Sequence, residues 1–100
     1  MKTSTLYGEI TVIINRVAQL PTGDVPGTRA AKQAFLQALY AARMDVLDSQ
    51  GDTQSPQAVK NLLFAARWQL EVGARMLERL PESIRNQVDL QPLIEDLPVD

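Results

Sequence analysis

Side chains that could perform acid–base chemistry or bind a metal are scarce in this sequence. Histidine and cysteine are both absent, which removes imidazole bases, thiolate nucleophiles, disulfides and the usual nitrogen and sulfur ligands of zinc. Twelve carboxylates remain, and Asp45, Asp48 and Asp52 lie close together along the chain. They lack the ligand offsets and the final glutamate of an EF-hand loop. We therefore expect a solvated turn there, with neither a metal nor a catalytic role.

Motifs for nucleotide binding and nucleophilic catalysis are not recognisable either. The glycines within residues 23–27 are accompanied by no lysine and follow no strand pattern, whereas a phosphate-binding loop needs both. Serine–lysine catalysis would require Lys32 or Lys60 beside a serine in a pocket, and no motif indicates it. We expect a protein that is not an enzyme and binds no cofactor. A hidden carboxylate pair in a cleft is the least supported alternative.

The charge is unevenly distributed along the 100 residues. Residues 1–85 hold all ten basic residues and eight acidic ones, a formal charge of +2, whereas residues 86–100 hold four acidic and no basic residues, a charge of −4. Neither part has the charge density that is typical of a nucleic-acid-binding protein.

Proline and glycine divide the chain into three long segments with helical periodicity, at about residues 3–20, 28–48 and 56–80. In the first segment, one face collects large apolar residues at spacings of four and three, although the β-branched run at 10–14 also permits a strand. The second segment is rich in alanine, the best helix former. In the third, Ser55 and Pro56 stand at favoured N-cap and first-turn positions, and Thr28 is the expected N-cap of the second.

These segments predict an all-α fold, a three-helix antiparallel bundle built around a helical hairpin. The polar loop near residues 49–55 joins the second and third helices as antiparallel neighbours, and the first helix packs across them. A short fourth helix is expected at residues 81–88. We assign residues 1–88 to the helical bundle and residues 89–100 to an acidic-hydrophobic C-terminal segment.

The second and third helices carry more apolar surface than one core face requires. In the third helix, a stripe from Val59 to Leu80 holds the core spacing, and a second ridge lies nearly opposite. This ridge consists of Phe64, Trp68, Val72 and Met76 and is flanked by Arg75 and Arg79. In the second helix, Leu36 and Tyr40 begin a comparable second face beside the Phe35–Val46 stripe.

Two interpretations of the ridge remain open at this point. Other segments of the same chain can cover it, in which case it belongs to the core. Alternatively it meets another protein, because Trp, Met and Arg are enriched at the centres of protein interfaces. A homodimer would bury the ridge by two-fold symmetry. In that case Phe64, Trp68, Val72 and Met76 form the contact centre, Arg75 and Arg79 its rim, and Leu36 and Tyr40 an extension.

The C-terminal segment alternates apolar and acidic residues and also has two interpretations. It can dock on a basic groove of a partner and become ordered there. It can instead fold back on the bundle, so that its leucines fill a gap and its acids lie near Arg75, Arg79 or Arg85.

We therefore expect a non-enzymatic protein-interaction module, such as a small adaptor, chaperone, inhibitor or antitoxin or immunity partner, that binds itself or another protein. The alternative is a small nucleic-acid-binding regulator with an acidic autoinhibitory tail. No apolar stretch approaches the roughly 20 residues of a membrane span, and a cysteine-free chain with no secretory signal is typical of the cytoplasm.

Overall fold

The computed structural model describes residues 2–23, 25–51 and 53–99, and in these ranges it contains five helices and no strand. They are α1 (Thr3–Gln19), α2 (Thr28–Ser49), α3 (Pro56–Leu77), α4 (Glu82–Arg85) and α5 (Gln91–Glu95). The predicted all-α bundle is confirmed, and the first segment is a helix, not a strand.

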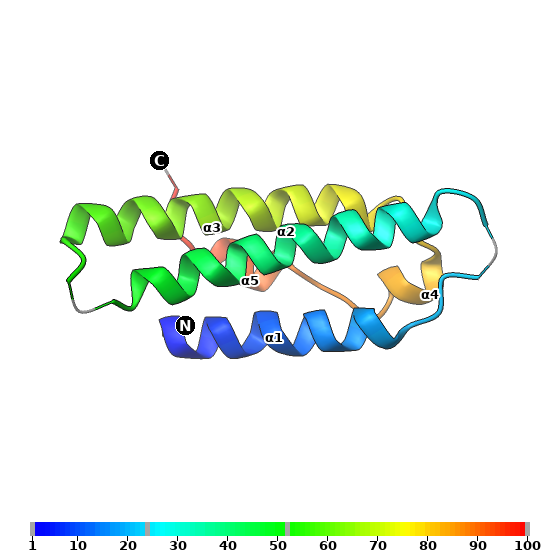
Figure 1. The fold of residues 1–100 in the computed structure, drawn as a ribbon, viewed down its shortest axis with the longest axis horizontal. Coiled ribbons are helices and arrows are strands. Elements are labelled where there is room, and N and C mark those ends of the chain that lie inside the picture. Colours follow the sequence, from blue (N-terminus) through cyan, green and yellow to red (C-terminus); the bar gives the residue numbers. More distant parts are fainter. Residues whose placement is uncertain (1, 24, 52, 100) are drawn as a thin grey trace.

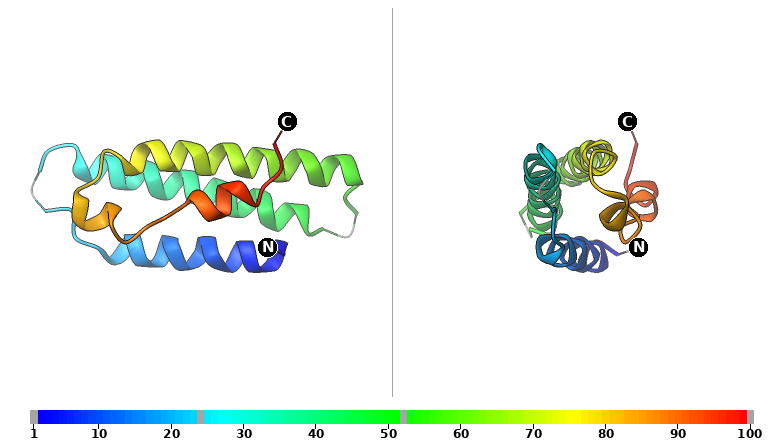
Figure 2. Two further views of the ribbon diagram at one scale, coloured as in Figure 1. Left: turned by 180° about the vertical axis from the view of Figure 1, so that it is seen from behind. Right: turned by 90° about the vertical axis from the view of Figure 1, so that its right-hand side faces the viewer.

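The three long helices form an elongated bundle of 47 × 22 × 19 Å. α2 and α3 make the antiparallel hairpin, and α1 lies along α2 (Figure 1). Seen from the end, α1, α2, α3 and the C-terminal helices occupy four corners (Figure 2). α5 packs against α3, so that the short C-terminal helices stand where a fourth long helix would stand in a four-helix bundle.

The start of α3 confirms the expectation from the sequence, and the start of α2 differs from it. The hydroxyl of Ser55 accepts a hydrogen bond of 3.1 Å from the amide of Ala58, as an N-cap does. At α2, Gly27 takes the N-cap position in place of Thr28, with a φ of 85°. Glycine adopts this left-handed conformation at no steric cost. Gly27 has no side chain, so the first turn of α2 receives no side-chain cap.

The C-terminal parts of the chain are less helical than predicted between residues 78 and 88 and more helical beyond them. α3 ends at Leu77, not near Leu80, and α4 covers only residues 82–85 of the range 81–88. α5 has no counterpart in the prediction. It begins beside Pro92, which is tolerated in the first turn of a helix.

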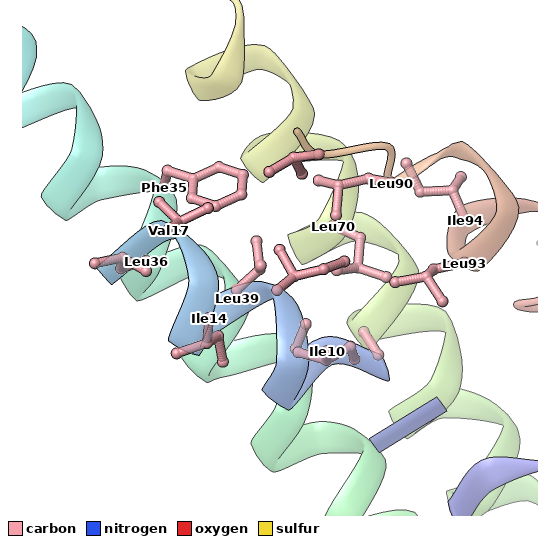
Figure 3. Close-up of a cluster of buried hydrophobic side chains, with 14 of the residues drawn as sticks. Ile10, Ile14, Val17, Phe35, Leu36, Leu39, Leu70, Leu90, Leu93 and Ile94 are labelled. Carbon is pink, nitrogen blue, oxygen red and sulfur yellow. The ribbon is translucent and has the colours of Figure 1, made fainter. Parts of the chain in front are cut away.

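The core lies between the helices and follows the predicted main stripes (Figure 3). The side chains of Phe35, Leu39, Ala42 and Val46 are completely buried, as are Ala66 and Leu70 of α3. α1 buries Leu6, Ile10, Ile13, Ile14 and Val17 against them.

The C-terminal segment folds back and completes this core. Leu90, Leu93, Ile94 and Leu97 are all buried, and Figure 3 shows Leu90, Leu93 and Ile94 on the same side of the cluster as Leu70. Of the two interpretations of residues 89–100, the structure therefore shows folding back for the described part, which ends at residue 99.

Arg67 of α3 binds this segment through its backbone. Its Nη1 atom donates hydrogen bonds to the carbonyl oxygens of Ile94, at 2.8 Å, and Leu97, at 2.9 Å. Its Nε atom donates to Glu71 Oε1 at 3.1 Å. Glu71 thus pairs with the arginine one turn before it. A cation that satisfies carbonyls at a helix end also compensates the negative end of the helix dipole.

A glycine on the inner face of α3 lets α2 come close. A Cβ atom built on Gly73 would lie 2.8 Å from Leu39 Cδ1 and 3.6 Å from Leu90 Cδ1. Since Leu39 is completely buried, its side chain has little room to move away. Gly73 therefore fits both the hairpin partner and the C-terminal segment.

We predict that Gly73→Ala lowers the free energy of unfolding by about 1 kcal/mol. Replacing a glycine inside a helix by alanine normally raises this free energy by about 1 kcal/mol, because alanine favours the helical conformation. The cost arises because the new methyl group displaces Leu39. Gly8→Ala in α1 is the matched control, since a Cβ there meets nothing within 4 Å. Chemical denaturation should show a gain for Gly8→Ala. A comparable gain for Gly73→Ala would contradict the close approach.

We also predict that Arg67→Met lowers the free energy of unfolding by about 2 kcal/mol, because it leaves two carbonyls without their charged donor. Methionine retains much of the apolar stem and removes the guanidinium. The control is Arg75→Met, since Arg75 is exposed on the same helix. Denaturant midpoints measure both changes. Equal effects of the two substitutions would show that Arg67 does not hold the segment.

Candidate interaction surfaces

The outer face of α3 exposes two aromatic side chains, Trp68 and Phe64. Trp68 is 54% exposed and Phe64 is 39% exposed, and Val99, which is 64% exposed, lies beside them. Phe64, Trp68 and Val99 line a shallow hollow of about 230 Å³ together with Arg67 and Glu71. We call Phe64, Trp68 and Val99 the α3 patch.

The α3 patch lies on the side of α3 that faces away from the core, next to the end of the C-terminal segment. Arg67 and Glu71 border it, and the hydrogen bonds of Arg67 to residues 94 and 97 place the end of the chain, including Val99, next to α3. A second hollow joins Phe64 and Val99 to Lys60. Both α3 and the C-terminal segment thus contribute side chains to the patch.

The rest of the predicted ridge is less accessible than Phe64 and Trp68. Val72 is half-buried, and Met76 is half-buried and packs against the core. Arg75 and Arg79 are exposed. Met76 and Arg79 line a different groove, between the start of α2 and the end of α3. The structure therefore separates Met76 from Phe64 and Trp68 and leaves Val72, one turn after Trp68, only partly accessible.

The two residues expected to extend the interface on the second helix have different positions. Leu36 is only 7% exposed and belongs to the core. It is not available to a partner. Tyr40 is exposed and lines a separate hollow with Tyr7, Arg43, Met44 and Leu47.

Arg43 organises that second surface. Its guanidinium carbon lies 5.7 Å from the ring centre of Tyr7 and 5.5 Å from that of Tyr40, which is the range of a cation–π contact. Arg43 also donates a 3.4 Å hydrogen bond to the hydroxyl of Thr11. These contacts join α1 to α2 and occupy the charge, so Arg43 is engaged within the fold.

Arg67 is the residue of greatest consequence that the sequence did not identify as a contact. Its position near the ridge was visible from the helical spacing. The carbonyl oxygens that it binds were not, because they become available only once residues 91–97 fold against α3.

The carboxylates form no metal site among the described residues, where no group of three or more acidic side chains is placed to hold an ion. Asp52 lies outside those residues. The pKa of Asp45 is raised above its usual value by burial and, to a lesser degree, by the nearby charge of Asp48. No basic residue occupies the last turn of α2 to compensate them.

None of the helices in the described part of the chain has the combination of length and apolar character that a membrane span requires. Comparison with protein-family models, with curated proteins and with solved structures found no significant match to this chain.

We predict that Asp45→Asn stabilises the protein at pH 7 and that this gain disappears in acid. The pKa of Asp45 is raised in the folded state, so its ionised form opposes folding above that pKa. This free-energy penalty falls as the pH decreases towards 3.8, the pKa of Asp45 in the unfolded chain, and disappears at lower pH because the carboxyl is then protonated in both states. Thermal unfolding at several pH values measures this, with exposed Glu9→Gln as control. An equal gain at pH 3 and pH 7 would contradict it.

Proposed function

We propose that the protein is a non-enzymatic protein-interaction module that forms a homodimer through the α3 patch. The observation that carries this proposal is the exposure of Trp68 and Phe64 on one strip of α3. The chain's own C-terminal segment already fills the core, so no described segment is left to cover them.

Exposed aromatic side chains gain more free energy than smaller side chains when a partner covers them. Burying a large apolar side chain is favourable by about 1.5–3 kcal/mol, and aromatic residues dominate the binding energy of protein interfaces. Trp68 lies between Phe64 and Val72 on α3 and has more than half of its surface available. It is the natural centre of a contact.

A second copy of the chain fits this face without a conflict of charge. If two α3 helices pack antiparallel about Trp68, Phe64 of one copy lies opposite Val72 of the other. Arg75 then lies opposite Asn61. No two like charges oppose each other, so the isologous pairing is electrostatically permitted.

The use of basic residues within the fold favours protein binding over nucleic-acid binding. Lys32 Nζ donates to the carbonyls of Ala18 and Leu20, and Arg16 Nη1 donates to that of Gln87. These two cations and Arg67 thus donate hydrogen bonds to backbone carbonyls of the protein itself. The proposal includes the cytoplasmic location that the cysteine-free composition suggested.

We predict that Trp68→Ala weakens dimerisation at least tenfold, as expected for an interface hot spot of about 2 kcal/mol, and leaves the helical content unchanged. Val72→Glu should have the same effect by placing a charge in the contact. The control is Met44→Ala, since Met44 is 55% exposed on α2, away from the α3 patch. Sedimentation equilibrium over a range of concentrations gives the dissociation constants.

A wild-type protein that remains monomeric at millimolar concentration would overturn the homodimer. So would a dimer that Met44→Ala weakens as much as Trp68→Ala does. Circular dichroism and denaturant unfolding of each variant establish that a loss of association is not a loss of fold.

A further inference from the structure

A groove of about 470 Å³ lies at the end of the bundle opposite the hairpin loop. Residues 25–27 form one wall, Met76 comes from the last turn of α3, and Arg79 lies two residues after the end of this helix. The floor consists of Ala30, Ala31 and Ala34 of α2, whose short side chains leave the space open. The volume lies within the range of about 300–1,000 Å³ of small-molecule sites. The floor is apolar, whereas one end is rich in hydrogen-bond donors.

The donors come first from the start of α2. Thr28 N–H donates to the carbonyl of Val25 at 3.2 Å, and Ala31 N–H to that of Gly27 at 2.9 Å. The amides of Arg29 and Ala30, which lie between them, make no hydrogen bond to the described residues, and the N-cap glycine offers no side chain. Unsatisfied amides at a helix start attract an anion.

Thr28 is an independent indication of a ligand. Its side chain lines the groove and is only 5% exposed, yet its hydroxyl makes no hydrogen bond to any described residue. No fully enclosed polar side-chain atom in the described ranges lacks a partner, so Thr28 Oγ1 must keep access to solvent. A polar group buried to this extent normally has a partner, and here the open side is the groove.

Arg79 adds a positive charge to the lining of the groove. Its side chain is exposed at the groove and forms no ion pair or hydrogen bond with the described residues. The guanidinium of Arg79, the hydroxyl of Thr28 and the amide of Ala30 thus belong to residues that line the groove together with the alanines. This combination matches a ligand with a negative head and an apolar body.

We propose that this groove binds a small amphiphilic carboxylate, with its head group at Thr28, Arg79 and the amide of Ala30, and its apolar chain over the alanines and Met76. The site is independent of the α3 patch, with which it shares no residue. In this proposal Met76 and Arg79 bind the ligand, whereas the sequence pattern had placed them at a protein interface.

The test is titration of the ¹⁵N-labelled protein with octanoate, with acetate, inorganic phosphate and 1-octanol as comparison ligands. We expect octanoate to shift the amide signals of residues 28–31 and to bind at least tenfold more tightly than acetate, phosphate or octanol. Arg79→Gln should weaken octanoate binding about tenfold, because a charge-assisted contact is lost. Thr28→Val, which conserves the shape, should weaken it several-fold.

Arg75→Gln is the matched control, because Arg75 is an exposed arginine one turn earlier that does not line the groove. It should leave the octanoate affinity unchanged. The proposal is overturned if octanoate causes no shift at residues 28–31, or if Arg75→Gln weakens binding as much as Arg79→Gln. Equal binding of phosphate would overturn the amphiphilic class, and equal binding of octanol would overturn the role of the negative head.

Discussion

The structure depends on the contact by which the Arg67 guanidinium holds the end of α5 against α3. Three long helices leave one side of the apolar core open, and the C-terminal segment closes it with Leu93, Ile94 and Leu97. A five-residue helix has little stability of its own, so it needs both apolar burial and satisfied carbonyls. Arg67 supplies the second requirement from a position next to the α3 patch. Core closure and the exposed surface are therefore coupled.

Two other basic residues of the helical body also donate hydrogen bonds to backbone carbonyls near helix ends. Lys32 binds carbonyls at the end of α1, and Arg16 binds the carbonyl of Gln87 just after α4. A long cationic side chain can reach a helix end while its stem covers apolar surface. The division of charge along the sequence thus reflects internal bonding as well as solvation. Arg79 differs, since it has no such partner among the described residues, and it stands at the groove.

Periodicity in the sequence was sufficient to predict the three long helices and their principal core faces, because helical spacing determines which side chains share a side. It could not determine which segment covers each side. Leu36 and Tyr40 appeared equivalent on the second face of α2, yet the first is buried and the second is exposed. Met76 was expected on the exposed ridge of α3, but it packs against the core and lines the groove. The helical α5 and its bond to Arg67 arise from tertiary packing, for which the local sequence gives no signal.

Residues 90–97 form a structural wall of the core, and native-state hydrogen exchange measures this property directly. The amides of Ile94 and Leu97 donate hydrogen bonds to the carbonyls of Leu90, at 3.0 Å, and Ile94, at 3.2 Å, so their exchange reports opening of the segment. If the wall is integral, both amides exchange with a free energy close to that of amides in the centres of α2 and α3. Rapid exchange of both, with α2 and α3 still protected, would show a detachable tail and contradict the account.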